Sequence, residues 1–271
     1  MTQRQNERGV AIVTGAAGGM GSASAAQLSA QGWPLILCDL NAQQLEASAA
    51  LLRATGTPVA LLAGDIADPA FPARLIAELG DRQVGAFIHT AGLSPTMGDA
   101  AKIFSVNYDA TVRLVEAVRP KMSEGGCAVL ITSSSAYMIA SPEIDAAIDA
   151  LAEGDDSSSL LTFAPSPQHA YPISKKAVIR LVAREAAAFG ERMARIVSIS
   201  PGLIDTQMGR AEKAASPQVE TMMAQTPLSR FGAADEIASV AVFLCSPAAS
   251  FVSGCDIPVD GGMLAALGKL R

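Results

Sequence analysis

The stretch Val10-Ala-Ile-Val-Thr-Gly-Ala-Ala-Gly-Gly-Met-Gly21 decides the fold of this chain. Its apolar part, Val10–Thr14, predicts a buried β-strand, and the glycines that follow predict a tight turn into a helix that begins near Met20. Such glycines let the backbone approach a pyrophosphate, whose charge is attracted by the free N–H groups at the start of the helix. An ordinary turn is the alternative, but the strand and the helix that a dinucleotide-binding motif requires are both predicted here.

Short apolar runs alternate with longer Ala-rich amphipathic stretches along the whole chain. Apolar strands separated by helices indicate a parallel sheet that is buried on both faces. We therefore expect an α/β protein with a Rossmann-like doubly wound sheet, helices on both of its faces, and a single domain over residues 1–271. The expected strands are Val10–Thr14, Pro34–Asp39, Pro58–Ala63, Ala86–Thr90, Ala128–Thr132, Ala194–Ser198 and Cys255–Val259. The expected helices are Met20–Gln31, Ala42–Ala54, Ala73–Leu79, Ala100–Met122, Tyr171–Phe189 and Asp235–Cys245.

Composition excludes several classes of protein. The 271 residues are 50% hydrophobic, which suffices for one large core. A net charge of −6 without a basic cluster argues against nucleic acid as a partner. The uncharged stretch from Val10 to Cys38 is broken by five glycines and Pro34, so we expect no membrane span. The cysteines lack the spacing of metal ligands, so we expect no metal, reduced buried thiols and a cytoplasmic protein. They are Cys38, Cys127, Cys245 and Cys255.

Two segments interrupt the alternation of strands and helices. Residues 137–169 form an insertion without Lys or Arg, and their Ala and Leu content predicts a helix near Pro142–Ala152. Residues 204–228 are rich in methionine and are expected to form a long substrate loop. Loops of that length in a compact domain are usually functional or mobile. The acidic residues of the insertion are Glu143, Asp145, Asp149, Glu153, Asp155 and Asp156.

An acidic residue ends the second predicted strand, where Asp39 precedes Leu40. A carboxylate in this place can accept hydrogen bonds from both ribose hydroxyls of an adenosine, and it would repel a 2′-phosphate. Asp39 therefore predicts NAD rather than NADP as the cofactor. The alternative is that Asp39 caps the helix that follows Leu40.

Tyr171 and Lys175 lie four residues apart, which places a phenol and an ammonium group one turn apart on the same helix face. A free phenol has a pKa of about 10 and is a poor base at neutral pH. A cation nearby stabilises the phenolate and lowers that pKa. Such a pair can accept or donate a proton near neutral pH, as the oxidation of an alcohol or the reduction of a ketone requires.

Further motifs follow in a fixed order along the chain: Thr14-Gly15-x-x-x-Gly19-x-Gly21, Gly64-Asp65-Ile66, Ser105-Val-Asn107-Tyr, Ile131-Thr-Ser133, Tyr171-x-x-x-Lys175, Pro201-Gly202 with Thr206, and Asp260-Gly261-Gly262. Together they resemble the short-chain dehydrogenase/reductase family over nearly the whole length. The resemblance implies that Tyr171 is the general acid or base, that Lys175 assists it and binds the nicotinamide ribose, and that Ser133 binds the substrate oxygen. It also implies that Asn107 holds a water that links Lys175 to solvent.

The same resemblance implies the residues that bind the cofactor. They come from the glycine loop, from the ends of the next strands, from the catalytic helix and from the segment after the sixth strand. They are Gly15, Gly18, Gly19, Met20, Gly21, Asp39, Leu40, Asp65, Ile66, Ala91, Gly92, Tyr171, Lys175, Pro201, Gly202, Ile204 and Thr206.

The chain departs from the family pattern at two short motifs. The fourth strand usually ends Asn-Asn-Ala-Gly but here reads His89-Thr90-Ala91-Gly92, and we expect His89 to be a satisfied buried histidine rather than a catalyst. Three consecutive serines leave two candidates for the catalytic one. The alignment favours Ser133, and Ser134 is the alternative.

The segment between Ser133 and Tyr171 is longer than in most of the family. This insertion and the stretch Leu244–Gly254 resemble the bacterial 3α-hydroxysteroid dehydrogenase/carbonyl reductase subgroup. That resemblance implies an extra helix that alters or blocks the usual four-helix dimer contact. We still expect a homo-oligomer, either a dimer or a tetramer.

Four methionines, Met138, Met208, Met222 and Met223, lie in the segments expected to enclose the substrate, and methionine adapts to irregular apolar shapes. With no cation in the insertion to bind an anion, we expect a bulky apolar secondary alcohol or ketone, such as a steroid, a terpenoid or an aromatic compound. Methionines that only fill the core are an equal alternative, and Tyr137 is an open candidate for contact with the substrate. A polyol, sugar or diol dehydrogenase is the second enzymatic hypothesis, and a non-catalytic dinucleotide-binding regulator is the third.

Overall fold

The computed structural model describes residues 9–153, 157–215 and 218–270, so Asp155 and Asp156 of the predicted insertion lie outside the described residues. Its centre is a seven-stranded sheet of order β3-β2-β1-β4-β5-β6-β9, in which each pairing is parallel. The strands are β1 (Val10–Thr14), β2 (Leu35–Asp39), β3 (Val59–Ala63), β4 (Val84–His89), β5 (Met122–Ile131), β6 (Arg195–Pro201) and β9 (Asp256–Val259). The short strands β7 (Ile204–Asp205) and β8 (Gly232–Ala233) pair separately. The chain order reverses between β1 and β4, which is where doubly wound sheets bind ligands.

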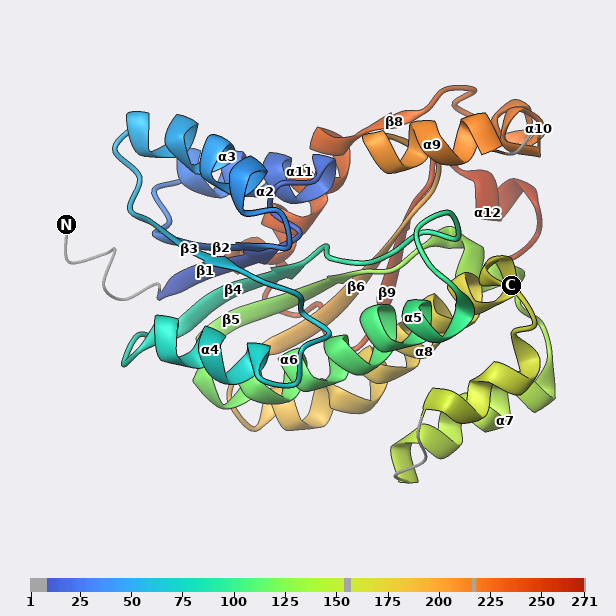
Figure 1. The fold of residues 1–271 in the computed structure, drawn as a ribbon, viewed down its shortest axis with the longest axis horizontal. Helices are drawn as coiled ribbons and strands as arrows, with labels where there is room; N and C mark the ends of the chain where they lie inside the picture. Colours follow the sequence, from blue (N-terminus) through green and yellow to red (C-terminus); the bar gives the residue numbers. More distant parts are fainter. Residues whose placement is uncertain (1–8, 154–156, 216–217, 271) are drawn as a thin grey trace.

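Helices cover both faces of the sheet (Figure 1), as expected for a Rossmann-like fold. On one face lie α2 (Gly19–Ala30), α3 (Ala42–Ala54) and α11 (Ala234–Leu244). On the other lie α4 (Phe71–Leu79), α6 (Ala110–Val118) and α8 (Pro167–Gly190). In the described residues, no helix is both long enough and apolar enough to span a membrane.

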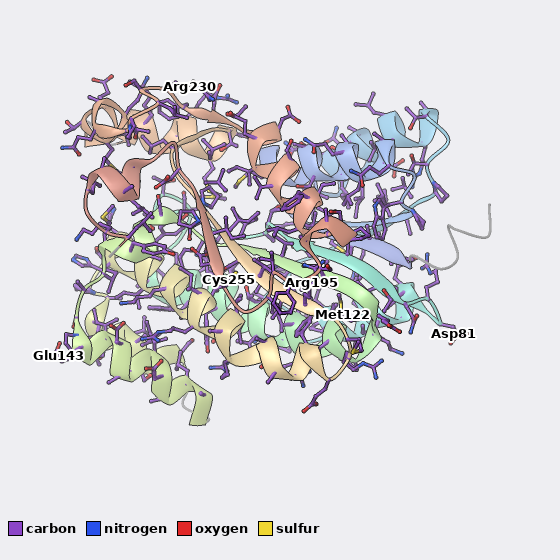
Figure 2. All side chains as sticks on the ribbon, turned by 180° about the vertical axis from the view of Figure 1, so that it is seen from behind. Asp81, Met122, Glu143, Arg195, Arg230 and Cys255 are labelled. Atoms are coloured by element: carbon purple, nitrogen blue, oxygen red, sulfur yellow. The ribbon has the colours of Figure 1, made fainter. Side chains whose placement is uncertain are left out.

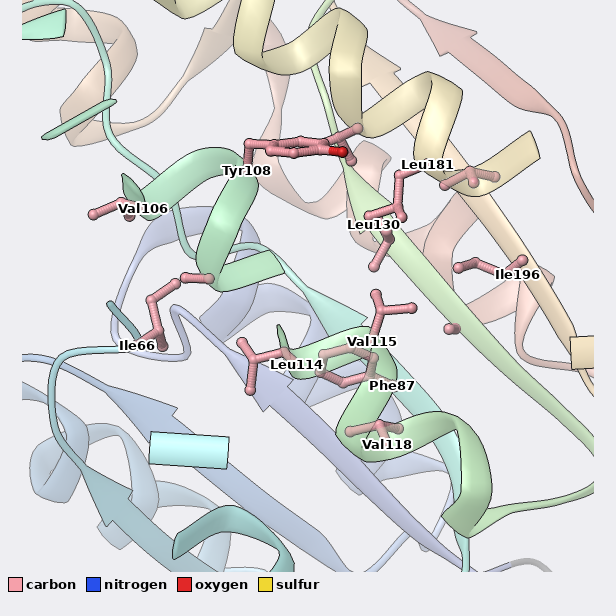
Figure 3. Close-up of a cluster of buried hydrophobic side chains, with 14 of the residues drawn as sticks. Ile66, Phe87, Val106, Tyr108, Leu114, Val115, Val118, Leu130, Leu181 and Ile196 are labelled. Atoms are coloured by element: carbon pink, nitrogen blue, oxygen red, sulfur yellow. The ribbon is translucent and has the colours of Figure 1, made fainter. Parts of the chain in front are cut away.

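Successive strand residues point to opposite faces and so build two separate cores. In β1, Ile12 belongs to the core under α4, α6 and α8, while Ala11 and Val13 belong to the core under α2, α3 and α11. Figure 3 shows the first core, where side chains of three neighbouring strands meet those of α6 and α8. They include Phe87, Leu130 and Ile196 from the strands, Leu114, Val115 and Val118 from α6, and Leu181 from α8.

The long helix expected over Ala100–Met122 is broken in two. It begins as α5 (Ala100–Phe104), widens into the π-helix Ser105–Asp109, continues as α6 and ends in the 3-10 turn Arg119–Lys121. Met122 is therefore not helical but begins β5, whose pairing with β4 shifts register before Cys127. Asn107, one of the predicted site residues, lies in the middle of this π-helix. Such widened turns are frequent at functional sites.

The insertion contains the expected helix, α7 (Pro142–Ala150), between 3-10 turns at Ser134–Met138, Leu151–Glu153 and Ser157–Phe163. Ser141 caps α7 by accepting the N–H of Ile144, and Glu143 and Asp145 favour the positive end of the helix. Figure 2 shows Glu143 on the periphery of the molecule. The helix packs along α8, where Lys176 pairs with Asp145 and donates a 2.9 Å hydrogen bond to the carbonyl of Ile139. The predicted extra helix is thus confirmed, and it covers part of α8.

The methionine-rich segment was expected to be a long loop. It instead contains two helices, α9 (Gln207–Ala215) and α10 (Gln218–Gln225). Its residues 216–217 lie outside the described residues. At the end of this segment, Leu228 donates its N–H to the carbonyl of Gly261. Gly261 lies just before α12 (Met263–Ala266). A remaining 3-10 turn, Pro247–Ala249, follows α11.

Candidate active site

Two positions of the glycine loop, Gly15 and Gly21, leave no room for a side chain. Gly15 has a φ of 67°, and a Cβ there would lie 2.7 Å from Oγ1 of Thr90. A Cβ on Gly21 would lie 2.1 Å from the carbonyl oxygen of Gly15, so any side chain would collide. Gly18 and Gly19 are exposed at the start of α2, and a Cβ on Gly18 would meet only the Gly15 carbonyl. The loop is a backbone cradle at a helix start, which fits the pyrophosphate of a dinucleotide.

Asp39 is fixed against this loop. Its Oδ2 accepts the Ala17 N–H at 2.9 Å, and its Oδ1 accepts the Asn41 N–H at 3.0 Å. The helix cap of α3 is Asn41, whose side chain accepts the N–H of Gln44. The alternative role of Asp39 as the cap is therefore wrong, and the carboxylate is left directed at the edge of the glycine loop. Leu40 beside it is 71% exposed and offers an apolar surface there.

Asp65 follows β3 and is held by a partner that the sequence did not suggest. Its carboxylate accepts the Ala67 N–H at 2.8 Å and pairs with Lys102 at 3.1 Å. Burial alone would raise the pKa of Asp65, but these two bonds outweigh it and hold the pKa below its usual value. Ile66, expected at the cofactor, instead has its side chain 7% exposed in the core (Figure 3), so only its backbone can face a ligand.

The segment after β6 returns to the glycine loop. A Cβ on Gly19 would lie 2.8 Å from Cγ2 of Thr206, so these two predicted cofactor residues are in contact. Thr206 accepts the Gly209 N–H at 3.1 Å and so caps the first turn of α9. Gly202 follows Pro201 and lies against Asp260, whose Cα would be 2.7 Å from a Cβ at that position. Ile204 is buried behind this segment.

Asn107 is buried and braces the chain after β4. Its Oδ1 accepts the Leu93 N–H at 2.7 Å, and its Nδ2 donates to the Leu93 carbonyl at 3.0 Å and to Ser174 at 3.2 Å. A Cβ on Gly92 would lie 3.1 Å from Oδ1 of Asn107 and 3.3 Å from Nζ of Lys175. A Cβ on Gly15 would lie 2.8 Å from the backbone N of Ala91, so the turn of Ala91 and Gly92 lies between the glycine loop and Lys175 of α8.

Tyr171 and Lys175 lie near the start of α8 on the side facing β5. Lys175 is buried, donates a 3.0 Å hydrogen bond from Nζ to the carbonyl of Ile131, and lies 5.8 Å from the centre of the Tyr171 ring. Ser174 lies between them, and its hydroxyl donates to the Tyr171 carbonyl at 2.7 Å. The phenol and the ammonium group are thus neighbours, as the spacing predicted.

The serine turn follows β5 directly. Ser133 is half-buried and its Oγ accepts hydrogen bonds from the N–H and the hydroxyl of Ser135, at 3.2 and 3.0 Å. Ser134 is 5% exposed. Ser133 is therefore the more accessible of the two candidates, and α8 packs against the turn that it begins.

Asp256 of β9 accepts hydrogen bonds from residues before and after the three serines. It accepts the phenol of Tyr137 at 2.8 Å and the hydroxyl of Thr132 at 3.1 Å, in addition to that of Ser198. Burial, and then the hydrogen bond to Asp256, raise the pKa of Tyr137. The Tyr137 hydroxyl is directed at the edge strand and its proton is already engaged there.

His89 is buried with a partner on each ring nitrogen, as expected. The four methionines of the enclosing segments are half-buried, so none of them belongs to the fully buried core. Of the cysteines, Cys38, Cys127 and Cys245 are buried free thiols, whereas Cys255 is exposed, contrary to expectation. Among the described residues, no group of three or more His, Cys, Asp or Glu side chains is arranged to hold a metal ion.

Tyr171 and Lys175 are thus neighbours on α8, which packs against the turn that begins at Ser133 beyond the carboxyl end of β5. Residues 9–144 match the family model described as short chain dehydrogenase, and residues 157–264 match the model described as enoyl-(acyl carrier protein) reductase. The chain belongs to the short-chain dehydrogenase/reductase family. It is an oxidoreductase of this family, whose members bind a nicotinamide dinucleotide.

Known short-chain dehydrogenases/reductases resemble it over nearly their full length. It is 31% identical over 265 residues to D-threitol dehydrogenase of Mycolicibacterium smegmatis, which covers 93% of this chain and 92% of that protein. It is 29% identical over 262 residues to 3-alpha-hydroxysteroid dehydrogenase/carbonyl reductase of Comamonas testosteroni, which covers 94% and 96%. The crystal structure of the Brucella melitensis short-chain dehydrogenase/reductase of glucose/ribitol dehydrogenase type has a TM-score of 0.75 at 28% identity, over 96% of this chain and 98% of that one. The predicted likeness to the hydroxysteroid dehydrogenase subgroup is confirmed.

Three residues of the site were missed from the sequence: Lys102, Thr111 and Asp256. Thr111 follows Asn107 by four residues, and that helical spacing was a usable signal. Lys102 pairs with Asp65, and Asp256 accepts the phenol of Tyr137, over long separations in sequence. Nothing in the local sequence marks either residue.

Proposed function

We propose that this protein interconverts a secondary alcohol and a ketone with NAD, on a bulky and largely apolar substrate. The observation that carries the proposal is the position of the Lys175 ammonium. It is buried, bound to the Ile131 carbonyl and adjacent to the Tyr171 ring, at the end of the strand that leads to Ser133. An ammonium group held there favours the phenolate of Tyr171 and so supports proton transfer.

The dinucleotide supplies the hydride chemistry when it is bound, and the protein orients and polarises the substrate. Tyr171 removes the proton of the alcohol in oxidation and returns it in reduction. Ser133 accepts two hydrogen bonds, and its own proton has no acceptor among the described residues, so it can donate to the substrate oxygen. Lys175 holds a positive charge beside the phenol. Asn107, in the π-helix, binds the backbone of Leu93 and so fixes the turn at Gly92 next to Lys175.

The preference for NAD over NADP rests on Asp39. The Ala17 and Asn41 N–H groups fix its two carboxylate oxygens at the edge of the glycine loop. Each oxygen keeps a further lone pair that can accept a ribose hydroxyl, whereas a 2′-phosphate would meet a fixed negative charge.

The apolar substrate class is supported by the residues around the site. Met138 follows the serine turn, Met208 belongs to α9, and Met222 and Met223 belong to α10; all four side chains are half-buried. The described part of the insertion contains no Lys or Arg to bind an anionic group. The Comamonas testosteroni relative, named for a hydroxysteroid and for carbonyl reduction, supports the same class.

A polyol is the second candidate substrate, because the Mycolicibacterium smegmatis relative is a D-threitol dehydrogenase. A regulator without turnover is disfavoured, since Asn107, Ser133, Tyr171 and Lys175 are all present at the site. A homo-oligomer and a cytoplasmic location stay predictions. The packing of α7 on α8 supports the expectation that a dimer contact through α8 is altered.

The test is a substrate panel with purified protein, in which formation of the reduced nicotinamide is followed by its absorbance. We expect turnover with NAD and 3α-hydroxysteroids or related apolar secondary alcohols, and slower turnover with D-threitol. Faster turnover of D-threitol would select the polyol hypothesis. Binding of NAD by calorimetry without turnover of any alcohol or ketone would favour the regulator.

A further inference from the structure

A chain of buried hydrogen bonds runs through the core behind the active site. Oγ1 of Thr14, the residue before Gly15, lies 2.7 Å from Nδ1 of His89. Nε2 of His89 lies 2.9 Å from Oγ1 of Thr111, which donates a 2.8 Å hydrogen bond to the carbonyl of Asn107. Each of these side chains is 3% exposed or less, so solvent does not share their bonds.

The chain continues from Asn107 to the catalytic helix. Nδ2 of Asn107 donates to the hydroxyl of Ser174, and that hydroxyl donates to the carbonyl of Tyr171. Ser174 is fully buried. One continuous path therefore links the end of β1, where the glycine loop begins, to the backbone of the proposed general acid or base.

Proton counting fixes the direction of this path. Thr111 has one hydroxyl proton, and the Asn107 carbonyl is an acceptor only, so that proton goes to Asn107. Thr111 must then accept from His89, which requires a proton on Nε2. Nδ1 is left unprotonated and accepts the hydroxyl proton of Thr14. The opposite tautomer would direct two acceptors, Oγ1 of Thr111 and the Asn107 carbonyl, at each other across 2.8 Å.

We propose that His89 is a positioning residue that fixes the catalytic π-helix through its neutral Nε2–H tautomer. By orienting the Thr111 hydroxyl toward the Asn107 carbonyl, it holds Asn107 where it can brace Leu93 and Ser174 at the same time. The role rests on the proposed function, because it concerns the geometry of Asn107 and Tyr171 in that reaction.

The surroundings of His89 maintain the neutral form that this role needs. Burial, and then the positive charge of Lys175, lower the pKa of His89 to about 3. Lys175, on α8, is the cation whose charge acts on the His89 imidazole. Phe87 packs beside that imidazole, with 5.8 Å between the two ring centres. The chain is therefore complete over the whole range in which the enzyme is expected to work.

The tautomer can be read directly by NMR in the intact protein, because the chain has only two histidines, His89 and His169. With ¹⁵N-labelled histidine, and with His169→Gln to assign the signals, we expect His89 to show a protonated Nε2 and an unprotonated Nδ1 from about pH 8 to about pH 5. An Nδ1–H tautomer, or protonation within that range, would overturn the proposal. This readout does not depend on turnover.

The positioning role is tested with a matched pair of variants. Thr111→Val removes the hydroxyl at nearly constant shape, and we expect kcat to fall about five- to tenfold while the Kd for NAD stays within about twofold. Thr111→Ser keeps the hydroxyl and should recover most of the wild-type kcat. Equal kcat in Thr111→Val and wild type would refute the role. If the wild type turned over no alcohol or ketone, the proposed function would fail, and the NMR result would still decide the tautomer.

Discussion

Nζ of Lys175 donates a 3.0 Å hydrogen bond to the carbonyl oxygen of Ile131, the last residue of β5. This bond ties the cation on α8 to the strand that leads into the Ser133 turn. It places the ammonium group by backbone geometry, which varies less than the position of a long free side chain. The proton-transfer residues on α8 and the serine turn after β5 are thereby held as one unit.

Lys175→Met should lower kcat at least about a hundredfold, because the positive charge that favours the phenolate is lost. Lys176→Met is the matched control, since Lys176 points to the insertion and pairs with Asp145. We expect the control to keep kcat within about twofold of the wild type. Steady-state rates at saturating NAD measure both variants, and a similar loss of kcat in the two would show that the charge of Lys175 has no special role.

Asp39→Ser should remove the discrimination between the two dinucleotides. We expect the Kd for NAD to rise about tenfold, because hydrogen bonds to a charged acceptor are lost, and the Kd for NADP to fall. Glu46→Gln changes another acidic residue on α3, in an exposed pair with Arg53, and should leave both constants unchanged. Calorimetric titration measures both ligands. Tighter binding of NADP than NAD by the wild type would contradict the assignment of Asp39.

Tyr137→Phe tests whether that tyrosine acts on the substrate. Because its hydroxyl donates to Asp256, its loss should cost about 1 kcal/mol of unfolding free energy and leave kcat within about twofold. Asp256→Leu should cost more, because Ser198 and Tyr137 would lose their acceptor together, whereas the Thr132 hydroxyl keeps the Ile199 carbonyl at 2.7 Å. Denaturant unfolding and steady-state kinetics measure the two effects. A tenfold fall of kcat in Tyr137→Phe would instead place the hydroxyl on the substrate.

His89 should make the protein less stable as the pH falls. Its pKa is about 3 when folded and 6.5 when unfolded, so below pH 6.5 the unfolded chain binds a proton that the folded one does not. The stability that comes from burying neutral His89 is fully present above pH 6.5. It is lost between pH 6.5 and about 3, by up to about 1.4 kcal/mol of unfolding free energy per pH unit. Denaturant unfolding at several pH values should show a smaller slope for His89→Gln than for the wild type. Identical slopes would show that His89 is not buried in its neutral form.

Much of the fold could be predicted from the sequence because the strands are buried on both faces. Continuous apolar runs such as Val10–Thr14 and Leu35–Asp39 leave little choice of structure, and the expected bounds of β1, β2 and α3 agree with the observed ones within one residue. The helix over residues 100–122 was drawn too long. The π-helix Ser105–Asp109 interrupts it, and there Asn107 exchanges hydrogen bonds with the backbone of Leu93, a contact that side-chain periodicity does not reveal.

The site was predictable where neighbours in sequence are also neighbours in space. Tyr171 and Lys175 share one helix turn, and Asp39 follows its strand directly, so their positions came from local geometry. Lys102 at Asp65 and Asp256 at Tyr137 depend on the strand order, which brings together residues 37 and 119 positions apart. His89 was expected to be satisfied, but its partners Thr14 and Thr111 lie 75 and 22 positions away.

The most direct test of the proposed chemistry compares wild type with Tyr171→Phe, using NAD and the fastest alcohol of the substrate panel. We predict that kcat falls by roughly a hundredfold or more in the variant, because the acid–base group is lost, while the Kd for NAD changes by less than about twofold. Turnover near the wild-type rate with the phenylalanine in place would contradict Tyr171 as the general acid or base, and with it the mechanism built on its contact with Lys175.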